Sequence, residues 1–265
     1  MSRRKTVLIT GCSDDGIGSG LALIFQQRNY HVFATARNPQ KMTKLQNLPN
    51  VTLLPLDVCD KTQIAAAVQA VTEHTRGTLD YLVNNAAHAY FGPILDQSLD
   101  DARKLFETNT FGPIEITQAF APLLIKARGT LAFITSIAGY MNIPWIGTYS
   151  ASKRSLEIVA DTLRLELAPF RVRVVSIVTG PVKTLGQSHF DDLTLPENSP
   201  YKPIEDKIAS FAQGNDGAAR EGIMAYSEKV VTEITRGKAL KFWCGAGVGS
   251  AWFANTFVPT SIMVA

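Results

Sequence analysis

The sequence has little cysteine and little net charge. Its three cysteines, Cys12, Cys59 and Cys244, are odd in number and have neither metal-site nor disulfide spacing. A reducing compartment is the simplest interpretation, so we expect a cytoplasmic protein that binds no metal. The net charge is only +3 and no long run of lysine and arginine is present, which gives no support to nucleic-acid binding.

Long uninterrupted apolar segments are also missing. The basic residues 1–5 are followed by only a short apolar run, which is not the core of a secretory signal. The last 24 residues, 242–265, carry no charge and are numerous enough to cross a bilayer, but glycine, asparagine and proline interrupt them. We interpret this segment as a final core strand plus an apolar tail, with contact to a membrane surface or a second subunit as the alternative.

Short apolar runs alternate with helical segments along the whole chain. The apolar runs have the length of buried strands and are Val7–Thr10, His31–Ala36, Val51–Leu56, Tyr81–Val83, Leu131–Thr135, Arg171–Val178 and Leu240–Cys244. Between them, Asp100–Ala127 is predicted as a long helix interrupted at Pro113, and Gly222–Gly237 as another helix. This alternation predicts one α/β domain over residues 1–265, a doubly wound parallel sheet with helices on both faces.

A glycine-rich turn, residues 10–18, joins the first strand to the first helix. Glycine lets the backbone approach a ligand closely, and the N-terminus of the helix attracts an anion. The turn therefore predicts a phosphate cradle. The generic Gly-x-Gly-x-x-Gly spacing is not met, so a plain tight turn is the alternative.

Arg37 directly follows the second predicted strand. In dinucleotide-binding folds this strand end faces the adenosine ribose, where an acidic residue binds a free 2′-hydroxyl and an arginine accommodates a 2′-phosphate. Arg37 therefore favours NADPH over NADH, with Ser13 of the turn as a second contact. A solvated surface arginine is the alternative.

Polar residues close several predicted strands. Asp57, Asn84 and Ser136 follow the third, fourth and fifth of them. Ligands of parallel sheets bind beyond the carboxyl ends of the strands, so these side chains are expected at one site. Residues 185–213, irregular and rich in proline before a short helix, are expected to form a substrate lid.

Tyr149 and Lys153 are four residues apart, so on a helix their side chains share a face. A lysine ammonium about 4 Å from the phenol would lower its pKa from near 10 toward neutrality, where acid–base catalysis is most efficient. Ser136, which a glycine- and proline-containing loop connects to Tyr149, has a hydroxyl that would hold a substrate oxygen. An ordinary pair on a surface helix is the alternative.

Together these residues resemble the short-chain dehydrogenase/reductase family over nearly the whole chain. The cofactor turn of that family, Thr-Gly-x-x-x-Gly-x-Gly, is similar to Thr10–Gly18 with one extra residue, and its Asn-Asn-Ala-Gly is similar to Asn84–Ala87, where Ala87 replaces glycine. The resemblance implies a Rossmann-type fold and a catalytic tetrad of Asn109, Ser136, Tyr149 and Lys153. The cofactor contacts that it implies for NADP(H) are Gly11, Ser13, Gly16, Ile17, Gly18, Arg37, Asp57, Asn84, Ala86, Tyr149, Lys153, Gly180, Val182 and Thr184.

The same resemblance implies the role of each catalytic residue. Tyr149 would protonate a substrate carbonyl as hydride arrives, with Lys153 lowering its pKa and binding the nicotinamide ribose. Ser136 would orient the carbonyl, and Asn109 would hold a water that relays protons. Substrate would meet Ser136, Tyr149 and His88, although a merely packed or solvated His88 is the alternative.

The implied function is NADPH-dependent reduction of a small, lipid-like or polyketide-type ketone by a homo-oligomer, a dimer or a tetramer. Within the family, Thr179-Gly180 and the apolar tail are most similar to the fungal acyl-dihydroxyacetone-phosphate reductase branch, which includes reductases of secondary metabolism. Because fold does not fix function, a non-redox isomerisation or cyclisation on the same fold, or a cofactor-binding scaffold, is the alternative.

Overall fold

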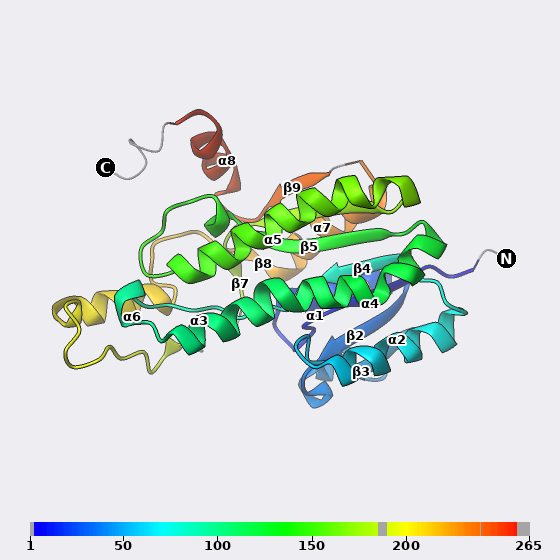
Figure 1. The fold of residues 1–265 in the computed structure, drawn as a ribbon, viewed down its shortest axis with the longest axis horizontal. Coiled ribbons are helices and arrows are strands. Elements are labelled where there is room, and N and C mark those ends of the chain that lie inside the picture. Colours follow the sequence, from blue (N-terminus) through cyan, green and yellow to red (C-terminus); the bar gives the residue numbers. More distant parts are fainter. Residues whose placement is uncertain (1–2, 185–189, 239, 259–265) are drawn as a thin grey trace.

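The computed structural model describes residues 3–184, 190–238 and 240–258, and within them a seven-stranded parallel sheet forms the centre of the molecule (Figure 1). The strands are β1 Thr6–Ile9, β2 His31–Ala36, β3 Val51–Pro55, β4 Tyr81–Asn84, β5 Thr130–Ser136, β6 Arg173–Thr179 and β9 Lys241–Cys244. Their order is β3-β2-β1-β4-β5-β6-β9. From β1 the strands are added in one direction to β3, and from β4 they are added in the opposite direction to β9. The point between β1 and β4 where the order reverses is where doubly wound sheets bind ligands. The predicted fold is confirmed.

Helices cover both faces of this sheet (Figure 1). One layer consists of α1 Ile17–Gln27 and α7 Ile223–Arg236, and the other of α2 Lys61–Thr75, α4 Gly112–Ala127 and α5 Gly147–Glu166. Phe25 and Tyr226 are fully buried in the first layer, and Phe120 in the second. Burial of each such side chain stabilises the fold by about 1.5–3 kcal/mol. Because both faces are covered, the central strands are continuously apolar rather than alternating.

The predicted helix 100–127 is in fact two α-helices joined by a π-helical turn. Here α3 spans Leu99–Phe106, the π-turn Glu107–Phe111, and α4 follows at once. The predicted interruption of the α-helix lies just before Pro113 and not at it: the π-turn ends at Phe111, and Pro113 is in the first turn of α4.

Two further boundaries have local causes. Strand β6 begins at Arg173 rather than Arg171, because Arg171 has a left-handed backbone, with φ of 59°, and closes the turn before the strand. Helix α7 ends at Arg236, one residue before the predicted bound, because Gly237, with a φ of 74°, forms the left-handed C-terminal cap that glycine adopts without strain.

The predicted lid lies partly outside the described residues, because 185–189 belong to the part that the structure does not describe. The remainder contains a 3₁₀ turn, Lys202–Ile204, and helix α6, Glu205–Ala212. A second, two-stranded sheet pairs β7 Val182–Lys183 with β8 Glu221–Gly222.

The start of the apolar tail is a core strand, as predicted. Strand β9 pairs with β6, with Phe242 opposite Ile177. Helix α8, Val248–Phe257, follows; it buries only Ala251. Among the described residues no helix is both long and apolar enough to cross a membrane. The end of the predicted tail, 259–265, lies outside the described residues.

Candidate active site

The glycine turn folds tightly against the carboxyl end of β4. Gly11 has a φ of 74°, and a Cβ there would lie 2.9 Å from the Cα of Ala86. A Cβ on Gly18 would lie 2.2 Å from the Gly11 carbonyl oxygen. The Asn85 side-chain amide donates to the carbonyls of Thr10 and Gly11, at 2.8 and 3.0 Å. Only glycine fits both positions, because the turn packs tightly against itself and against Ala86.

The N-terminus of α1 opens onto this turn without a side-chain cap. Gly16 is the N-cap residue, it makes no capping hydrogen bond, and the first turn contains no acidic residue. The first N–H groups of α1, starting at Ile17 and Gly18, therefore offer a site for an anionic group. This arrangement fits a dinucleotide pyrophosphate.

The extra residue of the turn is anchored to the segment after β2. Asp15 lies in this longer turn and has a left-handed backbone, with φ of 59°. The Asp14 carboxylate accepts hydrogen bonds from the Thr43 backbone N, the Thr43 Oγ1 and the Lys44 N, at 2.8, 2.6 and 3.1 Å. Burial acts to raise the pKa of Asp14, but these hydrogen bonds outweigh it and the pKa lies below its ordinary value. Sequence reasoning missed this role of Asp14, since its partners lie 29 and 30 residues away.

Arg37 and Asp57 stand at neighbouring strand ends. Strands β2 and β3 pair with Ala36 opposite Pro55, and each of the two polar residues follows shortly after. The Arg37 side chain is exposed and Asp57 is half-buried. Asp57 accepts from the Cys59 backbone N at 3.0 Å, which orders the turn after β3. The structure brings both residues to the expected edge, and their contact with a cofactor stays a prediction.

The other predicted cofactor residues lie around the switch point and after β6. Asn84 is only 2% exposed, and its amide donates to Thr117 Oγ1 on α4 at 3.1 Å, so its side chain braces the sheet against that helix. Ser136 pairs with Thr179 across β5 and β6. Gly180, Val182 and Thr184 therefore follow β6 close to Ser136, and their contact with a cofactor stays a prediction.

Ser136, Tyr149 and Lys153 come together at the end of β5. Ser136 is the last residue of that strand, and its Oγ accepts from the Ala138 backbone N at 3.1 Å. Tyr149 and Lys153 lie on α5, with the ammonium Nζ 6.0 Å from the centre of the phenol ring. Lys153 is 3% exposed, and its Nζ donates to the Ile134 carbonyl at 3.1 Å.

The pKa of Tyr149 differs from the prediction. Burial raises the pKa of Tyr149, and a hydrogen bond with Ser136 only partly offsets this. The predicted direction was therefore wrong: burial is the largest influence on this phenol, and the Lys153 Nζ hydrogen bond goes to the Ile134 carbonyl. Burial also lowers the pKa of Lys153 to about 8. Tyr149 is consequently protonated at neutral pH.

Asn109 is fully buried in the π-helical turn, where it links the loop after β4 to α5. Its Oδ1 accepts from the His88 backbone N at 2.7 Å, and its Nδ2 donates to the His88 carbonyl at 2.8 Å. The same Nδ2 donates to Ser152 Oγ at 3.0 Å, and Ser152 in turn donates to the Tyr149 carbonyl at 2.7 Å. Sequence reasoning missed Ser152. Both amide hydrogens are used, so a water at Asn109, which stays a prediction, would have to donate to Oδ1.

A buried carboxylate one turn after Lys153 ties α5 to the sheet. Glu157 is 1% exposed, and its Oε1 accepts from Ser176 Oγ at 2.7 Å and contacts Lys241 Nζ at 2.9 Å. Lys241, on β9, also donates to the Tyr140 hydroxyl at 2.9 Å and to Asp161 at 3.2 Å. The loop after Ser136 is thereby attached to the edge strand. No motif in the sequence pointed to this network.

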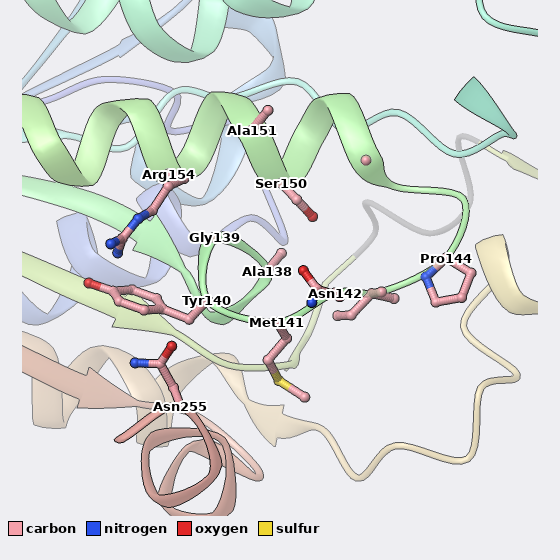
Figure 2. A pocket seen from close by; sticks show the side chains of 12 residues that line it. Ala138, Gly139, Tyr140, Met141, Asn142, Pro144, Ser150, Ala151, Arg154 and Asn255 are labelled. Carbon is pink, nitrogen blue, oxygen red and sulfur yellow. The ribbon is translucent and has the colours of Figure 1, made fainter. Parts of the chain in front are cut away.

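Two clefts flank the loops around the tetrad. One, of about 640 Å³, lies between residues 138–144, α5 and α8. Figure 2 shows Arg154 and Ser150 extending from α5 toward the loop, with Asn255 of α8 opposite. The Arg154 guanidinium lies 4.7 Å from the centre of the Tyr140 ring. The other cleft, of about 460 Å³, lies between residues 88–91, α3 and residues 190–194, and His88 lines it.

Comparisons with known proteins agree with this geometry. Residues 5–192 match the model of the short chain dehydrogenase family. The chain is 49% identical over 257 residues to the short-chain dehydrogenase PC-15 of Penicillium crustosum, covering 97% of this chain and 94% of that one. It is 41% identical over 212 residues to the NADPH-dependent 1-acyldihydroxyacetone phosphate reductase of Schizosaccharomyces pombe, covering 78% and 71%.

A solved structure shares the fold. The short chain dehydrogenase of Burkholderia cenocepacia in complex with NADP matches with a TM-score of 0.80 and 23% identity, covering 99% of this chain and 97% of that one. The chain therefore belongs to the short-chain dehydrogenase family. The likeness to the fungal acyl-dihydroxyacetone-phosphate reductase branch is confirmed as sequence similarity.

Proposed function

We propose that this protein is an NADPH-dependent reductase of ketones. The observation that carries the proposal is the convergence of Ser136, Tyr149 and Lys153 at the end of β5, beside a backbone cradle that fits a pyrophosphate. A complete acid–base group next to a dinucleotide cradle supports hydride chemistry over a purely structural role.

The residues around the switch point fit the cofactor. The N-terminus of α1 and the turn at Gly11 and Gly18 would hold the pyrophosphate, and Arg37 the adenosine 2′-phosphate. The names of the fungal relative and of the Burkholderia structure, which mention NADPH and NADP, support this choice over NADH. When bound, the cofactor supplies a hydride for the carbonyl carbon.

Tyr149 would supply the proton that balances this hydride. Its phenol is protonated at neutral pH because burial raises its pKa, so the O–H is ready to donate. The carbonyl oxygen becomes an alkoxide-like centre as hydride adds, and an alkoxide is a much stronger base than phenolate. The proton therefore moves from the Tyr149 Oη to the substrate oxygen even from a phenol with a raised pKa.

Ser136 and Lys153 would prepare this transfer. The Ser136 hydroxyl already hydrogen-bonds with Tyr149, so a carbonyl oxygen placed between the two would accept from both. Lys153 is buried close to the phenol and stabilises the phenolate that proton transfer leaves behind. Reversal of the same steps oxidises the alcohol.

The test is oxidation of NADPH, followed by absorbance, with a panel of aliphatic and aromatic ketones. We expect turnover with NADPH and much weaker turnover with NADH. Product analysis by mass spectrometry runs in parallel on the same reactions. Conversion of a ketone to an isomer or a cyclised product without consumption of NADPH would contradict the proposal and support non-redox chemistry on this fold.

A further inference from the structure

Four aromatic side chains from three separate segments form a cluster, which we call the aromatic cluster: Phe91, Trp145, Phe190 and Phe211. The ring centre of Phe91 lies 5.0 Å from that of Phe190 and 6.1 Å from that of Phe211. The ring centres of Trp145 and Phe211 are 5.6 Å apart, in an edge-to-face arrangement. All four side chains are half-buried.

The three segments leave adjacent strands of the sheet. Phe91 follows β4, Trp145 lies between β5 and α5, and Phe190 and Phe211 follow β6 and β7. These strands end at Asn84, Ser136 and Thr179. The cluster is therefore built on segments that leave the same carboxyl edge of the sheet as the tetrad. Phe91 and Phe190 also line the 460 Å³ cleft together with His88.

The backbone holds Trp145 in an unusual conformation. Its φ is 66°, in the left-handed region that a bulky side chain rarely adopts. The carbonyl of Trp145 accepts from the Gly92 backbone N at 2.7 Å, which ties the loop before α5 to the loop after β4. Strained residues that the surrounding structure maintains occur preferentially at ligand clamps and active sites. Trp145 is also only four residues before Tyr149.

We propose that the aromatic cluster closes the substrate site and makes it selective for ketones that carry a planar aromatic group. This inference rests on the proposed reductase function. A flat ring that inserts between Trp145, Phe91 and Phe211 replaces ring–ring contacts with equivalent ring–ligand contacts. A small aliphatic ketone separates the rings without replacing those contacts, so it binds less well.

Two variants each remove one ring of the aromatic cluster and suit the local backbone. Trp145→Asn is suitable because asparagine tolerates the left-handed conformation. Phe211→Leu keeps an apolar side chain in α6. Trp145→Phe retains a ring and serves as the conservative variant. Phe170→Leu is the matched control, since Phe170 is exposed and lies before the start of β6, at the opposite edge of the sheet.

Steady-state kinetics with NADPH would compare acetophenone and 2-acetylnaphthalene with 2-butanone and cyclohexanone. We expect Trp145→Asn and Phe211→Leu to lower kcat/KM for the aromatic ketones roughly tenfold, mainly through KM, because an aromatic contact is worth about that much. The aliphatic ketones should change less than about twofold, and Trp145→Phe should recover most of the loss. Equal losses on both classes, or losses in the Phe170→Leu control, would overturn the inference.

A binding measurement separates this inference from the proposed function. Line broadening of 2-acetylnaphthalene in proton NMR spectra reports binding to each variant without any turnover. If the wild-type protein reduces none of the four ketones, the reductase proposal fails on that panel, and binding still decides the role of the cluster. Weaker binding to Trp145→Asn and Phe211→Leu than to Phe170→Leu supports it; unchanged binding, or none to the wild type, contradicts it.

Discussion

The side-chain amide of Asn109 pairs with both backbone polar groups of His88, accepting from its N–H at 2.7 Å and donating to its carbonyl at 2.8 Å. This amide therefore makes the same pair of hydrogen bonds to His88 that a residue of a neighbouring β-strand would make. Aspartate would lack the donor, and leucine would leave two backbone groups unpaired. Through Ser152, the same amide is connected to the backbone of Tyr149. Asn109 therefore fixes the loop that carries His88 relative to the proposed acid.

Arg37→Ala should abolish most of the preference for NADPH. The exposed guanidinium at the end of β2 would pair with the 2′-phosphate, and such charge-assisted contacts are worth roughly 1.5–3 kcal/mol, or about 10–150-fold in affinity. Values of kcat/KM for NADPH and NADH would be measured for the wild type, Arg37→Ala and the control Arg236→Ala in α7. If NADH use falls together with NADPH use, Arg37 has a structural role and the argument from β2 is wrong.

Lys241→Met should destabilise the fold by leaving the buried Glu157 carboxylate without its cation. Breaking a fully buried ion pair costs about 3–5 kcal/mol; we expect about 2–3 kcal/mol here, since the Lys241 side chain is 30% exposed. The double variant Lys241→Met/Glu157→Gln removes the unpaired charge and should recover much of that loss. Urea denaturation gives the free energies of unfolding. Equal stability of wild type and Lys241→Met would show that the network contributes nothing.

The buried Lys153 predicts a pH dependence of stability. Its pKa is lowered to about 8 in the folded protein, from an ordinary value of 10.5. The folded state therefore loses this proton before the unfolded state does, so the contribution of Lys153 to stability rises between about pH 8 and pH 10.5. Relative to Lys153→Met, the wild type should gain on the order of 2–3 kcal/mol over this interval. A difference that stays constant or falls with pH would contradict the lowered pKa.

Removal of the residues from Trp252 onward should change the assembly of the protein. Trp252 contacts Phe257 edge to face, Phe253 contacts Phe257 at a tilted angle, and all three rings are about half exposed or more. Because these rings pack on one another and little on the rest of the fold, we predict that they contact a second copy of the chain. Light scattering would compare the full chain with a variant that ends before Trp252, which should form smaller species. Unchanged assembly combined with loss of binding to phosphatidylcholine vesicles would favour a membrane surface instead.

The sheet could be predicted from the sequence because each buried parallel strand is a short apolar run that needs no distant information. Ser136 was found from its position at a strand end, and Tyr149 and Lys153 from their four-residue spacing on a helix. What escaped prediction depends on contacts between residues far apart in sequence. Asp14 reaches Thr43, and Glu157 reaches Lys241, without any local signal.

The direction of the Tyr149 pKa shift shows the same limit. The four-residue spacing places Lys153 on the correct face of α5 but does not say where its ammonium points. The Ile134 carbonyl, on a different element, receives the Nζ hydrogen bond, and burial then dominates the pKa of the phenol. Asn109, in the π-helical turn, likewise makes its buried contacts with His88 and Ser152, which lie 21 and 43 residues away in the sequence.

The turnover number of Tyr149→Phe tests the central claim most directly. The substitution removes the proton donor and keeps the ring, so folding and NADPH affinity should survive, as circular dichroism and fluorescence titration would confirm. With NADPH and a ketone that the wild type reduces, we predict a fall in kcat of about 10²–10⁴-fold, the usual contribution of a general acid. A Tyr149→Phe protein that retains full kcat would contradict the assignment of Tyr149 as the proton donor.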